Sequence, residues 1–136
     1  MLSTWLYASI STLDRDEARE AVQTIMDASS PRNGSLNVTG TLIWTGQRFA
    51  QFLEGPHASI ASLRGSISRD TRHREVQTLE ASQAPARIFE GWSLAYSGNT
   101  SFVERELKRI CDQASTKAGD SARDLKSLLV EFERTC

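Results

Sequence analysis

One stretch, Gly40 to Gly55, constrains the fold more than any other part of the chain. It reads GTLIWTGQRFAQFLEG and contains two runs of strand-forming residues on either side of Gly46–Gln47. Glycine at the first position of a two-residue loop between such runs is typical of a type II′ β-hairpin. The sequence therefore predicts two antiparallel strands in which Trp44 lies opposite Phe49.

The predicted hairpin places an amide on an otherwise apolar face. Because side chains alternate along a strand, Gln51 shares its face with Leu42, Trp44, Phe49 and Leu53. A buried amide costs free energy unless its donors and its acceptor find partners. Gln51 can bond a neighbouring loop backbone, which the hairpin alone favours, or it can face a bound polar ring.

Size and charge exclude several classes of protein. The chain has 136 residues, enough for one domain with a core and too few for two ordinary ones. A net charge of −1 offers no basic surface to nucleic acid or to an anionic membrane. No apolar run reaches the length of a membrane span and no signal pattern is present, so a cytoplasmic location is expected. Cys111 and Cys136 are too few for a disulfide framework or a zinc site, and no metal is expected.

The order of the elements indicates an α+β fold. Alternating strands and helices around a hairpin suggest a ferredoxin-like sandwich, a mixed sheet of about five strands with two helices on one face. Two C-terminal helices could cover the other face, where Leu6, Ala8 and Ile10 form an apolar stripe. Strands are expected at 4–11, 41–45, 48–54, 75–83 and 92–96, and helices from an N-cap at Asp14 to the turn-forming residues 29–34, from Pro56, at 102–114 and around 125–132.

Four motifs along the chain match one family pattern in the same order. They are Leu6-Tyr7-x-Ser9; Asn33-x₃-Asn37-Val-Thr-Gly40 continued by Leu42-Ile-Trp44-x₃-Arg48-Phe49-x-Gln51-x-Leu53-Glu54-Gly55; Asp70-x-Arg72-His73; and Phe89-x₂-Trp92-Ser93. Together they resemble the BLUF domain, a flavin-binding sensor of blue light. The resemblance covers residues 4–96. It implies a sensor domain at 1–98, followed by a helical extension at 99–136 that packs on the domain.

The resemblance also implies roles for individual residues. Tyr7 corresponds to the family's photoactive tyrosine, which gives an electron and a proton to the excited flavin, and Gln51 to the glutamine that bridges that tyrosine and the ring. Asn33 corresponds to the asparagine at the edge of the ring, although it also reads as a turn residue before Gly34. The other implied flavin contacts are Ile25, Arg32, Phe49, Leu53, Ile67, Arg72 and His73. Without the resemblance, the apolar members and Tyr7 read as core, and the basic ones as a solvated helix end.

The last expected strand departs from the family at one position. The family often has Trp-Ser-Met there, whereas this chain has Trp92-Ser93-Leu94. Leucine keeps the volume of methionine but lacks its weakly accepting sulfur, so the departure concerns signalling through that sulfur and not flavin binding. Trp92, which could swap in and out near the glutamine, is the other implied signalling residue.

The resemblance implies a photoreceptor and not an enzyme. The resemblance also implies that the cofactor is FAD, or FMN or riboflavin, and that light rearranges the hydrogen bonds among Tyr7, Gln51 and the flavin. Within this chain no enzymatic or DNA-binding element follows the expected sensor, so output is expected through protein–protein contact, by self-association or through an effector. Two other classes are a flavin-free ferredoxin-like regulatory or dimerisation module and, less favoured, a small hydrolase. An acylphosphatase-like hydrolase would need an arginine and a glycine in the loop after the first strand, and residues 9–13 contain neither.

Overall fold

The computed structural model describes residues 1–14, 16–97, 101–114 and 116–135. Its strands form one five-stranded sheet in the order β4-β1-β3-β2-β5, with every neighbouring pair antiparallel except β2 and β5. The mixed sheet of the prediction is therefore present. The elements are β1 (Leu2–Ser11), α1 (Ala18–Ser35), β2 (Thr39–Trp44), β3 (Arg48–Gly55), α2 (His57–Ser68), β4 (His73–Ala84), β5 (Trp92–Ser97), α3 (Ser101–Gln113) and α4 (Ala118–Thr135).

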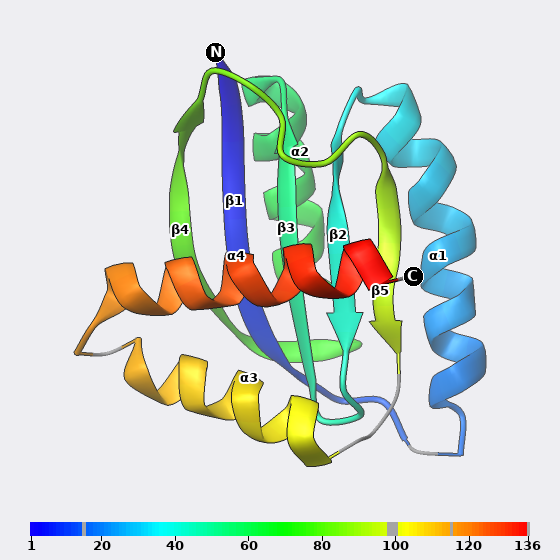
Figure 1. Cartoon of the computed structure of the whole chain (residues 1–136). Coiled ribbons are helices and arrows are strands. Elements are labelled where there is room, and N and C mark those ends of the chain that lie inside the picture. Colours follow the sequence, from blue (N-terminus) through cyan, green and yellow to red (C-terminus); the bar gives the residue numbers. More distant parts are fainter. Residues whose placement is uncertain (15, 98–100, 115, 136) are drawn as a thin grey trace.

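Helices cover both faces of the sheet. Helices α3 and α4 cross one face, and α1 and α2 lie on the other (Figure 1). Leu6 and Ala8 pack with the two C-terminal helices, as the apolar stripe suggested, whereas Ile10 is only partly buried. Each face has its own core because strand side chains alternate between the faces. The core under α3 and α4 contains Leu6, Ala8, Ile43, Ala50, Phe52, Leu107, Ile110, Leu125 and Leu129.

The hairpin has the predicted register. Trp44 lies opposite Phe49, and Leu42 lies opposite Gln51. Gly46 has a φ of 95°, the left-handed backbone that a type II′ turn requires at its first position. The central position of β3 also sets Gln51 opposite Tyr7 of β1.

Helix α1 differs from the prediction at both ends. Glu17, and not Asp14, occupies the N-cap position, and its side chain makes no capping bond. The helix also continues through Pro31, because Pro31 and Asp27 are exposed and water can bond the carbonyl that the proline leaves unpaired. It ends in a Schellman motif with Asn37 in the left-handed conformation at φ 59°, where the amide of Val38 bonds the carbonyl of Asn33 at 2.9 Å.

A buried carboxylate fixes the connection that leads into β5. Glu54 is fully buried and accepts the backbone N–H groups of Ile88 at 2.9 Å and Phe89 at 2.6 Å. The guanidinium of Arg87 donates to the carbonyls of Glu54 and Asn37, both at 2.9 Å. These bonds hold the start of β5 against the end of the hairpin, beside the site described next.

Candidate functional site

A pocket lies between the sheet and the two helices on the α1 and α2 face. Its lining comes from all five strands, from both helices and from the connection between α2 and β4. One wall is apolar and the mouth carries two guanidinium groups and a carboxylate. The lining residues are Tyr7, Ile25, Ser29, Arg32, Leu42, Phe49, Gln51, Ile67, Asp70, Arg72, His73 and Trp92.

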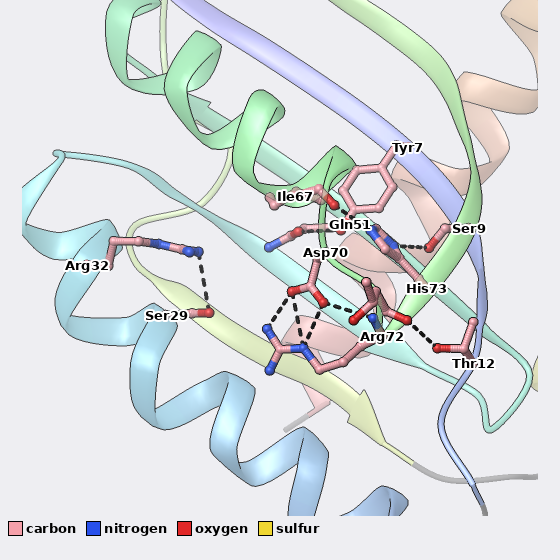
Figure 2. A network of polar contacts seen from close by, with 11 residues as sticks. Tyr7, Ser9, Thr12, Ser29, Arg32, Gln51, Ile67, Asp70, Arg72 and His73 are labelled. Atoms are coloured by element: carbon pink, nitrogen blue, oxygen red, sulfur yellow. Dashed lines mark hydrogen bonds and ion pairs between the residues drawn. The ribbon is translucent and has the colours of Figure 1, made fainter.

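A short hydrogen bond joins Tyr7 and Gln51 on the floor of the pocket. The phenol hydroxyl of Tyr7 donates to Oε1 of Gln51 at 2.7 Å, and both side chains are buried (Figure 2). Burial raises the pKa of Tyr7 well above its usual range, and the carboxylate of Asp70 adds to the shift. The tyrosine therefore keeps its proton and acts as the donor in this bond. Because Oε1 of Gln51 accepts that bond, the NH₂ group of the same amide points away from Tyr7.

His73 closes one end of the pocket and is held on both ring nitrogens. Its Nδ1 lies 2.7 Å from the hydroxyl of Ser9, and its Nε2 lies 2.6 Å from the carbonyl oxygen of Ile67. Because a carbonyl oxygen only accepts, Nε2 carries a hydrogen, and Nδ1 of the neutral ring accepts from the serine. The imidazole stands edge-on to the rings of Tyr7 and Phe49. His73 thus links β1 to the end of α2 beside the tyrosine.

Asp70 and Arg72 form an ion pair at the mouth. The Nε and Nη2 atoms of Arg72 donate to both carboxylate oxygens of Asp70, and the backbone N–H of Arg72 also donates to that carboxylate (Figure 2). These bonds lower the pKa of Asp70 below its usual value and raise that of Arg72. Across the mouth, Arg32 reaches Oδ1 of Asn33 at 3.3 Å. Burial and the nearby Arg72 lower the pKa of Arg32.

Two buried donors beside the pocket have no partner. They are Nδ2 of Asn33, whose residue is fully buried, and Nε1 of Trp92, and neither has a bond within the part of the chain that the structure describes. A buried N–H without an acceptor costs free energy, so such atoms call for a ligand or a water molecule. Donors at the edge and apolar side chains on the walls suit a flat ring that carries several hydrogen-bond acceptors.

Most of the residues expected to contact a flavin meet at this pocket. Eight of them line it: Tyr7, Ile25, Arg32, Phe49, Gln51, Ile67, Arg72 and His73, and Trp92 lines it too. Asn33 is buried next to Arg32 without lining the pocket, and Leu53 packs in the neighbouring core with Trp5, Ile60 and Leu63. The backbone of Leu94 pairs with Leu42, but its side chain lies outside the described residues.

Three lining residues were not anticipated: Ser29, Leu42 and Asp70. Leu42 could have been found, because strand alternation places it on the face of Gln51. Asp70 stands two residues before Arg72, and that spacing suits the turn in which its carboxylate accepts the Arg72 N–H. Ser29 carried no signal beyond its place on the buried stripe of α1.

Within the described ranges, no helix is both long enough and apolar enough to span a membrane. The same ranges contain no cluster of three or more His, Cys, Asp or Glu side chains placed to bind a metal ion.

Comparison with known proteins identifies one family. The family model described as sensors of blue-light using FAD (BLUF) matches residues 2–95. The blue light- and temperature-regulated antirepressor BluF of Escherichia coli is 34% identical over 89 residues, which are 65% of this chain and 22% of that protein. The photoactivated adenylate cyclase subunit beta of Euglena longa is 34% identical over 94 residues, 68% of this chain and 11% of that subunit. The chain thus spans about a fifth and a tenth of these relatives.

Solved structures agree with the family match. The dark-state structure of BlrB, a BLUF protein, has a TM-score of 0.71 and 30% identity, and the match covers 94% of this chain and 97% of that one. BlrP1 of Klebsiella pneumoniae, solved with FMN and cyclic diGMP, has a TM-score of 0.63 and 32% identity over 69% of this chain and 25% of BlrP1. The ferredoxin-like architecture is therefore shared with proteins of this kind.

Proposed function

The chain belongs to the BLUF family, the sensors of blue light that use FAD, and from this premise we propose that it senses light by rearranging the hydrogen bonds of Tyr7 and Gln51 around a bound flavin. The observation that carries the proposal is the 2.7 Å bond from the tyrosine hydroxyl to Oε1 of the glutamine, at the floor of a pocket that has one apolar wall. In the alternative of a flavin-free module, the buried donors of Asn33 and Trp92 would have no ligand to accept their hydrogen bonds.

The pocket residues divide the work of holding the flavin. Ile25, Phe49 and Ile67 would pack against the faces of the ring from α1, β3 and α2. Nδ2 of Asn33 and the amide of Gln51 would donate to acceptors along its edge. The two guanidinium groups at the mouth would meet the ribityl chain or its phosphates, with Asp70 holding one of them in place.

The chemistry of the switch depends on the asymmetry of one amide. A bound flavin absorbs the blue light and supplies the electron chemistry. Gln51 now turns its oxygen towards Tyr7, so its nitrogen is directed elsewhere. If the amide rotates or tautomerises, a donor replaces the acceptor beside the tyrosine hydroxyl, which must then accept instead of donate. No covalent bond is needed, so the light state reverts without assistance.

Signal output is proposed to run through protein–protein contact. Helices α3 and α4 pack on the sheet face opposite the pocket, and Trp92 connects the pocket to β5. We place the sensor domain at 1–98 and the protein in the cytoplasm. It would act by self-association or on an effector protein, and not as an enzyme.

The test is an absorption spectrum of the flavin-loaded protein in the dark and after blue light. A flavin spectrum that shifts to the red and recovers in the dark is expected. Tyr7→Phe removes the donor to Gln51 and should keep the flavin but lose the shift, and Gln51→Leu should do the same. Tyr96→Phe, which changes the chain's other tyrosine, is the matched control and should keep the shift. A protein that stays colourless after incubation with FAD, FMN and riboflavin would contradict the proposal.

A further inference from the structure

A groove of about 750 Å³ lies on the side of the molecule opposite the flavin pocket, between α4, β4 and the connection before β5. Helix α4 crosses this face of the sheet as a straight rod (Figure 1). The groove has apolar side chains on its floor, and one of them, Ile88, is 51% exposed. We call it the α4 groove, and it is lined by Leu79, Glu80, Ile88, Ala118, Gly119, Ala122, Arg123, Lys126, Ser127, Val130 and Glu131.

One row of α4 residues forms the outer edge of the groove. Gly119, Arg123, Ser127 and Glu131 are spaced four apart, so they lie on one ridge of the helix, and all four are exposed. The small Ser127 stands between the two charged residues of this ridge. One turn on either side of it stand a cation, Arg123, and an anion, Glu131. The ridge is therefore electrically antisymmetric about Ser127.

We propose that the α4 groove binds the α4 helix of a second copy of this chain, antiparallel and with the two-fold axis at Ser127. In this arrangement Arg123 meets Glu131 of the partner subunit, and the contact occurs twice because a two-fold interface is self-complementary. A parallel arrangement would set like charges against each other along the same ridge. Small side chains at Gly119 and Ser127 let the helices approach, and Ile88 is covered.

The inference rests on the self-association named under the proposed function and assigns it a surface. A copy of this chain suits the groove better than a strongly charged partner, because the rim carries both signs. Lys126 and Glu80 neutralise each other across the floor at 2.8 Å. Arg123 and Glu131 are the charged members of the outer ridge, and Arg123 also lies 3.3 Å from Asp120 and 3.8 Å from Asp124 of its own helix. Exposed ion pairs add little affinity alone, but they fix the orientation of helices whose apolar surface supplies the attraction.

A charge-swap experiment tests the arrangement. The mass of the flavin-loaded full chain would be measured by sedimentation equilibrium over a range of concentrations. Arg123→Glu and Glu131→Arg should each weaken the dimer about tenfold or more, because two attractive contacts become repulsive. The double variant should restore the dimer. Arg123 also contacts Asp120 and Asp124 within α4, so Glu131→Arg provides the single change that leaves those pairs intact. Arg19→Glu, exposed on α1, is the control.

Three outcomes would overturn the inference. They are a monomer at every concentration, a dimer that neither single reversal weakens, and a double variant that stays as weak as the single ones. The absorption shift is recorded on the same samples. A monomer that still binds flavin and responds to light removes the α4 dimer and leaves the sensor, whereas a dimer without flavin removes the sensor and leaves the dimer.

Discussion

Glu104 of α3 and Arg48 of β3 form an ion pair of 2.6 Å that is largely shielded from solvent, with 12% and 16% of the two side chains exposed. Glu104 also accepts a hydrogen bond from the hydroxyl of Thr45 at 3.0 Å. The pair fastens the first C-terminal helix to the loop end of the hairpin, three residues before Gln51. A movement of the hairpin would therefore reach α3 directly.

Glu104→Ala should lower the free energy of unfolding by about 2 kcal/mol, because it leaves the guanidinium of Arg48 shielded and without its carboxylate. Urea unfolding followed by circular dichroism measures the change. Lys108→Ala is the matched control on the same helix. It removes the Lys108–Asp112 pair, whose side chains are 59% and 64% exposed, and should change stability by less than about 0.5 kcal/mol. Equal losses in both variants would contradict the interpretation.

Asn33→Ala should weaken flavin binding roughly threefold to tenfold, because it removes a donor that is buried and unpaired in the protein alone. Quenching of flavin fluorescence on titration with the flavin-free protein measures the affinity. Ser30→Ala, exposed on the same helix, should bind flavin as the unchanged protein does. If Asn33→Ala bound flavin with unaltered affinity, the unpaired amide would have another partner.

Asp70→Asn should reduce stability at neutral pH and change its dependence on acid. The bonds from Arg72 depress the pKa of Asp70 in the folded protein. A depressed pKa contributes stability that is complete above the unfolded value, about 3.9, and is lost as the pH falls through the folded value. The difference between the two proteins should therefore be largest near neutrality and shrink in acid.

Unfolding free energies from about pH 7 downwards test this pH dependence. Glu90→Gln, on the exposed connection before β5, is the control and should follow the unchanged protein. A difference between Asp70→Asn and the unchanged protein that stayed constant into acid would show that the bonds of Asp70 do not depend on its charge.

Gly40→Ala and Gly34→Ala should have opposite effects. A Cβ at Gly40 would lie 1.8 Å from the carbonyl oxygen of Phe52, and the residue has a φ of 148°. We expect a loss of more than about 3 kcal/mol, or no folded protein. A Cβ at Gly34 meets nothing within 4 Å, and alanine favours the helix, so a gain of up to about 1 kcal/mol is expected. Thermal unfolding compares the two, and a stabilised Gly40→Ala would refute the reasoning.

The sequence was most informative in the hairpin, where the two-residue alternation of the strands is combined with a recognisable turn. Alternation along β2 and β3, together with glycine at position 46, determined that Trp44 would face Phe49 and that Gln51 would share their face. A slip of one residue would have turned every one of these side chains to the opposite face, so only one register was compatible with burial. The two-sided apolar pattern of β1 likewise indicated helices on both faces.

Local sequence signals gave the wrong result where contacts between distant parts of the chain determine the structure. Pro31 and Asn33-Gly34 favour a turn, yet α1 continues past them because Asn33 is buried against the sheet and the left-handed residue is Asn37. Leu53 shares the face of Gln51 but lies further along the strand, where it packs in the core with Ile60 and Leu63 of α2. The alternation of a strand identifies a face, and the helices above it decide which part of that face stays open.

Among the described residues, strand β5 pairs with β2 and with no other strand, through a parallel ladder that begins at Trp92. An inner strand can leave a sheet only by breaking two rows of bonds, whereas β5 would break one. The pocket thus borders an edge strand, which can open locally while β1, β2 and β3 stay paired. Local opening of β5 would therefore leave the β1–β3 pairing intact, and with it the position of Tyr7 opposite Gln51.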